Sequence, residues 1–486
     1  MSNFPRSAAL PLLATALSAA LVLNAHAAGP GGQWRVHTTS QAGSERFAEQ
    51  VLPAPIAASQ PFENETAVFV NTGKRYQTVL GFGGAITDSV AEVYARLTPA
   101  AQQQFLSAYF DTRAGLGYNL VRTSIHSSDF SSASYTYVKD GDRSLASFDV
   151  AHDRQFRLPL LRSALAAGKA SGTALKVFAT PWSAPAWMKS NGSMLGGGTL
   201  LPGDRDLWAS YMVKFVHAYE KEGVPIWGLS VQNEPMAKQR WESMIFTAKD
   251  ETDFVAENLG PALKKARLGE RKLVVWDHNR DLLPQRAAHI LSDARARPFI
   301  WGVGFHWYET WAGGDPMHRN VAAVHEAYPD INLLMTEATV EKFDPAKMQS
   351  WANGERYGRQ IIGDLNAGAV GWIDWNMLLD SKGGPNHVGN FCFAPLHASD
   401  DGQLIFTPSY AYLGHFSRYI RPQARRVSAS ASRSTLDTVA FRNADGSVAV
   451  VVMNGRDTAQ RYRLFIDQKE VALDIAAHAI QTVVQQ

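Results

Sequence analysis

The sequence has very little cysteine, and this absence excludes several classes of protein. Cys392 is the only cysteine among 486 residues, so the chain can form neither an intramolecular disulfide framework nor a multi-cysteine metal or iron–sulfur site. Charge of one sign is also scarce, since 47 basic and 45 acidic side chains leave a net charge of +2. Nucleic-acid-binding proteins normally carry a basic surplus, so no nucleic-acid partner is expected. With 45% hydrophobic and 19% charged residues, the chain can bury a large core.

A secretory signal peptide is predicted over residues 1–27. Arg6 supplies a basic start, Leu13 to Leu23 an apolar centre, and Ala25-His26-Ala27 a cleavage site of the A-x-A type. A membrane anchor is the alternative, but the apolar run is shorter than the roughly 20 residues that a span needs. No stable membrane insertion is therefore expected. Export with a single cysteine fits a bacterial periplasm or a secreted protein.

Internal repeats and long low-complexity segments are also missing, and from about residue 76 short strands alternate with helices. Eight runs rich in β-branched or aromatic residues predict strands. They are Gln77–Phe82, Asn119–Ser124, Leu175–Thr180, Ile226–Val231, Leu273–Trp276, Gly302–Trp307, Asn332–Thr336 and Val370–Trp375.

Three helices between these strands have recognisable beginnings. Thr98-Pro99 places a cap before a proline at the first helical position, Asp204 opens a helix to Lys221, and Asp250 opens a third. Eight strands that alternate with helices predict a (β/α)8 TIM barrel. An open doubly wound sheet is the alternative, but GFGGAITD at 81–88 lacks the G-x-G-x-x-G spacing of a dinucleotide loop.

The two ends of the chain predict a smaller β-domain. Alternating runs separated by turn signals occur at Leu436–Arg442, Val448–Met453, Tyr462–Ile466, Val471–Ile475 and Ile480–Val484. Two N-terminal runs, Trp34–Thr38 and Ala67–Val70, have no other evident partner. We therefore expect a lead-in at 28–75, a barrel at 76–420, and a C-terminal domain at 421–486 that forms a small antiparallel β-sandwich with the N-terminal strands.

Polar and aromatic residues follow several of the predicted barrel strands, where the active sites of such barrels lie. Glu234 and Glu337 end two different strands, so both carboxylates should face one mouth. Glycoside hydrolysis needs such a pair, one protonated and one ionised. A divalent metal could bind the same pair, but no His or Asp cluster with metal-ligand spacing accompanies it. We predict no metal and no cofactor.

Eight segments, taken together and in order, resemble one known family. They are GFGGAITDS (81–89), YNLVRTSIHSSDFSSASYTYV (118–138), FATPWSAPAWMKSNGSM (178–194), VQNEP (231–235), GFHWY (304–308), MTEA (335–338), VGWIDWN (370–376) and GGPNHVGNF (383–391). The chain resembles the family 30 glycoside hydrolases, and most closely their glucosylceramidase branch. The resemblance covers about Gln77 to Arg421.

This resemblance implies a retaining mechanism in which Glu234 is the acid/base and Glu337 the nucleophile. It also implies supporting roles for nine other residues. Arg122 and Tyr308 would hold the nucleophile, His306 would lie near it, and Asn233 would bond the sugar 2-OH. Trp182 and Trp375 would form the walls of the glucose subsite, Asp129 and Asn390 would contact outer hydroxyls, and Trp241 would border the aglycone. His126 is interpreted as structural.

The chain departs from the animal glucosylceramidases at Ser128, where they have Cys, and at His387, where they have Trp. These positions border the aglycone side, so the leaving group stays open. A β-glucosidase of the glucosylceramidase type, acting on a carbohydrate or a glycolipid, is the first hypothesis. An endo-β-1,6-glucanase, a xylanase and a non-catalytic carbohydrate-binding protein are the alternatives. The sequence leaves the oligomeric state open.

Overall fold

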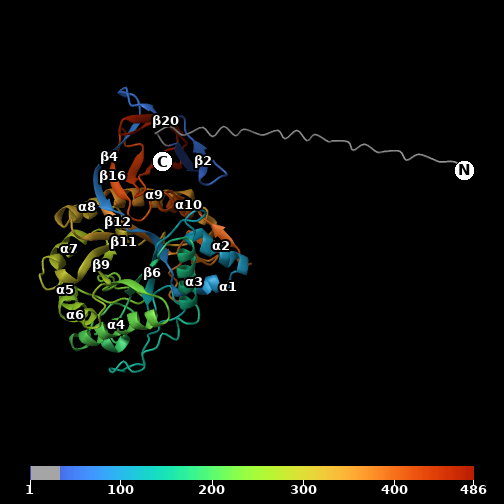
Figure 1. Cartoon of the computed structure of the whole chain (residues 1–486). Coiled ribbons are helices and arrows are strands. Elements are labelled where there is room, and N and C mark those ends of the chain that lie inside the picture. Colours follow the sequence, from blue (N-terminus) through green and yellow to red (C-terminus); the bar gives the residue numbers. More distant parts are fainter. Residues whose placement is uncertain (2–32) are drawn as a thin grey trace.

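The computed structural model describes Met1 and residues 33–486, so the rest of the predicted signal peptide lies outside the described residues. The described chain forms a barrel surrounded by helices, with a β-domain at one side of it (Figure 1). No helix within residues 33–486 is long and apolar enough to cross a membrane.

Eight parallel strands close into a barrel in the order β10-β11-β12-β5-β6-β7-β8-β9. The strands are β5 (Gly81–Ala85), β6 (Leu120–Ile125), β7 (Lys176–Pro181), β8 (Ile226–Ser230), β9 (Lys272–Asn279), β10 (Ile300–His306), β11 (Asn332–Glu337) and β12 (Ala369–Asn376). The prediction of a (β/α)8 barrel is confirmed, and the open sheet is wrong because β12 pairs with β5.

The helices around the barrel follow the predicted pattern closely. They are α1 (Asp88–Arg96), α2 (Pro99–Phe110), α3 (Arg157–Ala170), α4 (Arg205–Lys221), α5 (Ala248–Asp253), α6 (Gly260–Lys265), α7 (Leu283–Leu291), α8 (His318–Ala327), α9 (Trp351–Asn366) and α10 (Pro408–Ser417). Thr98 caps α2, as predicted, by accepting the backbone N–H of Ala101. The helix expected from Asp250 begins at Ala248, because Thr247 rather than Asp250 supplies its cap.

The first barrel strand begins later than the sequence indicates. Gln77 and Thr78 end β4 (Ala67–Thr78), a long strand of the β-domain, and β5 starts at Gly81. The glycines of β5 are needed for close packing: a Cβ on Gly83 would lie 2.0 Å from the carbonyl oxygen of Leu120. A glycine run has little strand propensity, so the pattern pointed to its β-branched neighbours instead.

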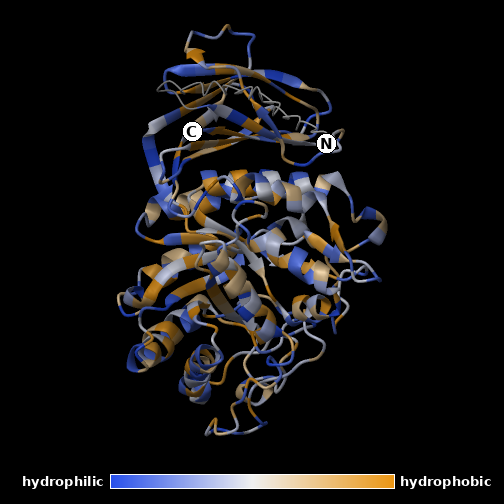
Figure 2. Ribbon diagram, turned by 45° about the vertical axis from the view of Figure 1, so that its right-hand side comes forward, coloured by the Kyte–Doolittle hydropathy of each residue, from blue (hydrophilic) through white to orange (hydrophobic). Residues whose placement is uncertain are grey.

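The β-domain is a ten-stranded sheet built from both ends of the chain, in the order β2-β1-β21-β18-β17-β16-β4-β19-β20-β3. Besides β4 its strands are β1 (Trp34–Ser40), β2 (Ala48–Val51), β3 (Ile56–Ala57), β16 (Arg425–Ala431), β17 (Asp437–Arg442), β18 (Val448–Asn454), β19 (Gln460–Ile466), β20 (Lys469–Ile475) and β21 (Ala479–Gln485). Figure 2 shows the sheet folded into two layers, and a buried apolar cluster that includes Val68, Val450 and Leu464 fills the space between them. The predicted β-domain is confirmed, with one difference: β4 and β19 run parallel, so the sheet is mixed.

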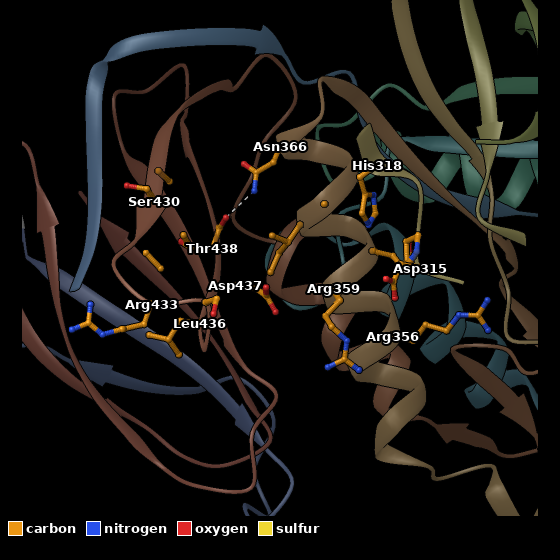
Figure 3. A pocket seen from close by; sticks show the side chains of 17 residues that line it. Asp315, His318, Arg356, Arg359, Asn366, Ser430, Arg433, Leu436, Asp437 and Thr438 are labelled. Atoms are coloured by element: carbon orange, nitrogen blue, oxygen red, sulfur yellow. Dashed lines mark hydrogen bonds between the residues drawn. The ribbon is translucent and has the colours of Figure 1, made fainter. Parts of the chain in front are cut away.

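One face of the β-domain packs on α9 and α10 of the barrel. Val451, Met453 and Ile480 belong to the same buried cluster as residues of the barrel helices, and Asn366 donates to the carbonyl of Thr438 at 2.9 Å. Beside this contact lies a polar groove of about 800 Å³, lined from the barrel side by residues such as Arg359 and from the β-domain by residues such as Asp437 (Figure 3).

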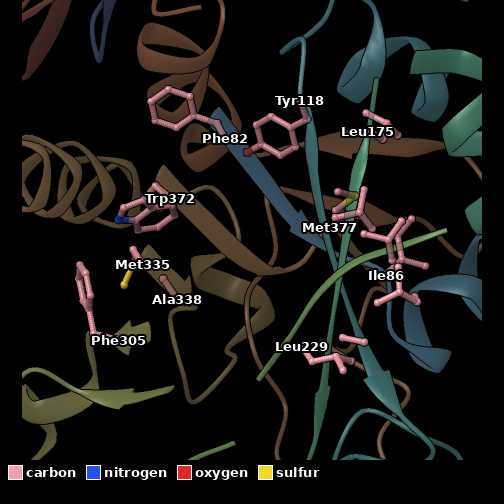
Figure 4. Close-up of a cluster of buried hydrophobic side chains, with 14 of the residues drawn as sticks. Phe82, Ile86, Tyr118, Leu175, Leu229, Phe305, Met335, Ala338, Trp372 and Met377 are labelled. Carbon is pink, nitrogen blue, oxygen red and sulfur yellow. The ribbon is translucent and has the colours of Figure 1, made fainter. Parts of the chain in front are cut away.

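Alternation along the barrel strands separates an inner from an outer core. Leu120, Phe178, Val274, Leu334 and Ile373 fill the barrel interior, while strand residues between them pack outward against the helices, as do Met335 and Trp372 in Figure 4. Two residues further along their strands, past the interior positions Leu120 and Ile373, come Arg122 and Trp375. The same alternation that buries the aliphatic layer therefore directs these side chains into the barrel mouth.

A three-stranded sheet of β13 (Leu378–Leu379), β14 (Leu396–Ala398) and β15 (Leu404–Phe406) follows β12. The loop 380–395 connects β13 to β14 and carries Asn390 and Cys392 towards the barrel mouth.

Candidate active site

Glu234 and Glu337 meet at the mouth of the barrel. Glu337 ends β11, and Glu234 follows β8. One carboxylate oxygen of each, together with a ring nitrogen of His306, lie within 4.8 Å of one another. Both glutamates are largely enclosed, with side chains 13% and 9% exposed, so the pair sits in a partly desolvated site.

Two donors hold Glu337. The buried guanidinium of Arg122, on β6, donates to Oε2 of Glu337. The hydroxyl of Tyr308 donates to Oε1 at 3.0 Å. Each oxygen of this carboxylate therefore accepts a hydrogen bond, and the two bonds fix its orientation.

Glu234 is held by its backbone and by His306. The Glu234 backbone has a φ of 46°, in the left-handed region, and its N–H donates to the carbonyl of Asp277 at 3.0 Å. Oε1 of Glu234 lies 3.2 Å from Nδ1 of His306. Because left-handed backbone is rare for residues with a side chain, the conformation indicates that the surrounding contacts force this glutamate into the mouth.

Asp277, near the end of β9, completes the polar layer beneath the glutamates. Its carboxylate accepts from Arg122 at 3.0 Å, from Nε2 of His306 at 2.9 Å, and from the hydroxyl of Thr336 at 2.5 Å. The sequence analysis did not select this residue. It stands one position beyond the predicted strand Leu273–Trp276, so the rule that reactive groups follow barrel strands could have found it.

The charges of this cluster shift the pKa of each member. Burial lowers the pKa of His306, but the carboxylates around it outweigh burial and raise it to about 9. Burial raises the pKa of Glu234, but the bond from His306 and the charges of His306, His278 and Arg122 together outweigh burial, so that the pKa is lowered. Glu234 and His306 thus hold one proton between them. The pKa of Glu337 is raised, because burial and the Glu234 charge outweigh the opposing cations His306 and Arg122.

Aromatic rings enclose the space beside Arg122. Trp182 and Trp375 stack with ring centroids 5.1 Å apart, and the guanidinium carbon of Arg122 lies 5.0 Å from the first ring and 5.4 Å from the second. Asn233 accepts from Arg122 at 2.9 Å. Three predicted site residues, Trp182, Trp375 and Asn233, therefore contact Arg122, which also donates to Glu337.

Three further predicted residues lie along the same wall. Asn390 donates to Asp129 at 2.8 Å, and burial raises the pKa of Asp129 to about 8. Trp241 is half-buried against the cluster that contains Trp182, Trp375 and Cys392. All eleven predicted site residues are thus brought to one end of the barrel.

His126 lies apart from this chemistry. Its ring nitrogens are bonded to the hydroxyl of Tyr211 at 2.8 Å and the carbonyl of Ser183 at 2.7 Å. Burial lowers its pKa to about 4, so it is a neutral group inside the structure. His387, one of the departures, is bonded to the Ser131 carbonyl, and its Nε2 lies 3.5 Å from a buried oxygen of Glu242.

The sequence analysis considered a metal at the glutamate pair but found no clustered histidine, whereas the structure brings His306 to the pair and gives the trio the composition of a cation site. A cation there would compete with Arg122 and with protonated His306, which already contact these carboxylates. The donor set therefore suits two glutamates that handle protons better than it suits a resident metal.

Comparison with known proteins agrees with this geometry. Residues 79–420 match the family described as "Glycosyl hydrolase family 30 TIM-barrel domain", and residues 423–483 match the one described as "Glycosyl hydrolase family 30 beta sandwich domain". The lysosomal acid glucosylceramidase of Mus musculus is 37% identical over 396 residues, covering 78% of this chain and 76% of that protein. An endo-1,6-beta-D-glucanase of Neurospora crassa is 28% identical over 476 residues, covering 93% and 92%.

Among solved structures, SrfJ from Salmonella typhimurium superimposes with a TM-score of 0.88 and 31% identity, covering 93% of this chain and 99% of that one. Barrel, companion sheet and paired carboxylates together define a glycoside hydrolase. The chain belongs to glycosyl hydrolase family 30.

Proposed function

We propose that the enzyme is a retaining β-glucosidase of the glucosylceramidase type. The observation that carries this proposal is the close approach of Glu234 and Glu337, whose oxygens lie within 4.8 Å of one another. Retaining glycosidases place their two carboxyl groups about 5–5.5 Å apart, whereas inverting enzymes leave room for a water between them.

In the first step, Glu337 attacks the anomeric carbon while Glu234 protonates the leaving oxygen. Arg122 and Tyr308 orient the attacking carboxylate, since each donates to one of its oxygens. His306 lies on the far side of Glu234 and can pass it the proton that Glu234 donates in this step, and the proton taken from water in the second step restores it. In the second step, Glu234 deprotonates a water that attacks the glycosyl-enzyme, and the configuration is retained.

For the remaining contacts we propose the roles that the family resemblance implies. Asn233 bonds the sugar 2-OH, Trp182 and Trp375 wall the glucose ring, Asp129 and Asn390 meet its outer hydroxyls, and Trp241 borders the aglycone. Support comes from their clustering beside Arg122.

An apolar aglycone is favoured by the loops around the mouth. Met236 follows Glu234, Trp311 follows Tyr308, and Phe391 follows Asn390, and these three side chains are 44%, 79% and 43% exposed. Each of the three follows, in the sequence, a residue of the site, and exposed large apolar groups beside a site commonly mark a binding surface. We name Met236, Trp311 and Phe391 the apolar rim and propose that it receives a lipid-like leaving group.

An endo-β-1,6-glucanase is the second candidate, favoured by the similarity to the fungal glucanase over 93% of the chain. The two candidates share one mechanism and differ in the aglycone. Comparing kcat/KM on glucosylceramide with that on a β-1,6-glucan decides between them, and a clear preference for the glucan would refute the lipid aglycone.

The mechanism is tested on an aryl β-glucoside followed by NMR. We expect the β-anomer of glucose as first product, and the α-anomer would refute retention. Glu337→Gln should abolish turnover. Glu234→Gln should spare substrates with good leaving groups, because these need no proton.

We also propose that the enzyme is exported after cleavage near Ala27, on the basis of the N-terminal composition. N-terminal sequencing of the mature protein from the periplasm and the medium tests this, and an intact N-terminus would refute it.

A further inference from the structure

Asp277 contacts the supports of both catalytic glutamates at once. On one side it accepts from Arg122, which donates to Glu337, and from Thr336, the residue before Glu337. On the other side it accepts from His306, which lies against Glu234, and its own carbonyl accepts the backbone N–H of Glu234. No other described residue has a hydrogen bond to this set of four partners.

The backbone places Asp277 there by an irregularity in β9. Gly304 of β10 pairs with Trp276 and Phe305 pairs with His278, so Asp277 is an extra residue between two pairs. Trp276 and Asp277 have φ values of 71° and 51°. A bulge of this kind redirects a side chain, and bulges are common beside active sites.

Residues of two barrel helices contact the irregular segment of β9 and hold it in place. Glu251 of α5 accepts the backbone N–H of Trp276 at 2.7 Å, and Arg286 of α7 lies over the Trp276 ring at 4.8 Å. Strained backbone persists where its surroundings enforce it, and such strain often serves function.

We propose that Asp277 is a positioning residue that sets the geometry of the nucleophile and of the acid/base together, through Arg122 and His306. The inference rests on the proposed retaining mechanism and extends it. Because the Asp277 carboxylate accepts from both Arg122 and His306, the positions of the nucleophile and of the acid depend on each other.

The charge of Asp277 matters as well as its shape. It faces two cationic groups, Arg122 and His306, while His306 is also surrounded by Glu234, Glu337, His278 and Tyr308. Opposite charges lower the pKa of Asp277 despite its burial. Its negative charge therefore balances Arg122 and keeps His306 able to hold a proton for Glu234.

The test measures, in the full-length enzyme, the support of Glu337 through Arg122 separately from the support of Glu234 through His306. The rate at which an activated 2-fluoro β-glucoside labels Glu337, followed by mass spectrometry, measures the nucleophile without the acid. His306→Gln, measured at a pH at which Glu337 is ionised, should slow substrates with poor leaving groups more than it slows labelling, because it removes the support of Glu234. Asp277→Asn should slow the labelling as well, by about 10²-fold, the effect of a misplacement near 1 Å.

Asp364→Asn is the matched control. Asp364 is also buried, and it also accepts from an arginine and a histidine, Arg280 and His318, but on α9 and outside the site. We expect it to lower the melting temperature and to leave the labelling rate unchanged. If Asp277→Asn does not fold, Thr336→Val, which removes the 2.5 Å bond to Asp277, should slow both labelling and poor substrates.

Labelling of a folded Asp277→Asn variant at the wild-type rate would overturn the proposal, and so would unchanged kinetics of Thr336→Val. If the wild-type enzyme itself is not labelled at Glu337, the proposed function fails, and this inference with it. That outcome is seen before any variant is made, so the two failures are distinguishable.

Discussion

His306 lies between two carboxylates, with Nδ1 3.2 Å from Oε1 of Glu234 and Nε2 2.9 Å from Asp277. A histidine in this position can pass a proton towards Glu234 without moving. The pH dependence of the enzyme should therefore depend on this ring.

The basic limb of the pH profile should report the proton that Glu234 and His306 share. The pair keeps it up to the pKa of His306, about 9, and activity on poor leaving groups falls as the pH rises above that value. In His306→Gln the acid stands alone, so the limb should move to lower pH. The measurement is kcat/KM as a function of pH for the wild type and for His306→Gln. A basic limb at the same pH in both would contradict the shared proton.

The acidic limb should report Glu337, whose pKa is raised, because the proposed nucleophile must be ionised. Tyr308→Phe removes the 3.0 Å bond to this carboxylate, so the limb should move to higher pH. A bond to a charged group contributes about 1.5–3 kcal/mol, which corresponds to a fall in kcat/KM of roughly 10- to 100-fold. Tyr410→Phe, which loses a buried bond to the Ala108 carbonyl, is the control and should leave the pH profile unchanged.

The apolar rim should affect one class of substrate more than another. Trp311 is 79% exposed, so Trp311→Ala removes contact area without opening the core. We expect a lower ratio of kcat/KM for glucosylceramide to that for a small aryl glucoside. A ratio equal to that of the wild type would exclude this side chain from aglycone binding.

Chelation should leave the activity unchanged. Arg122 and His306 already supply positive charge to Glu337 and Glu234, so the mechanism needs no metal. The measurement is hydrolysis of an aryl β-glucoside before and after EDTA treatment. Loss of activity that Mg²⁺, Ca²⁺ or Zn²⁺ restores would contradict it.

The glycine at 83 should be indispensable for folding. A Cβ there would lie 2.0 Å from a backbone oxygen of Leu120, so β5 and β6 would have to separate. Overpacking typically costs about 1–3 kcal/mol, and backbone atoms cannot yield as side chains do. Gly83→Ala should sharply lower the unfolding midpoint in urea, whereas Gly203→Ala, which meets nothing within 4 Å, should not.

Much of the fold could be predicted because its periodicity is local. The aliphatic strand cores, the Thr98 cap and the turn-separated runs after residue 420 all follow from short-range patterns. The start of β5 was misplaced because its glycines are selected by the approach of Leu120, a contact between strands that no local pattern records.

The sequence by itself determined the barrel, the β-domain assembled from both chain ends, and the two glutamates that end different strands. Only the tertiary structure decided how the glutamates are supported. Asp277 reaches them through a bulge in β9 that the strand pattern cannot reveal, since a bulge depends on the register of neighbouring strands. Likewise, the shared proton of Glu234 and His306 arises from burial and from charges gathered from distant segments, and these exist only once the barrel has closed.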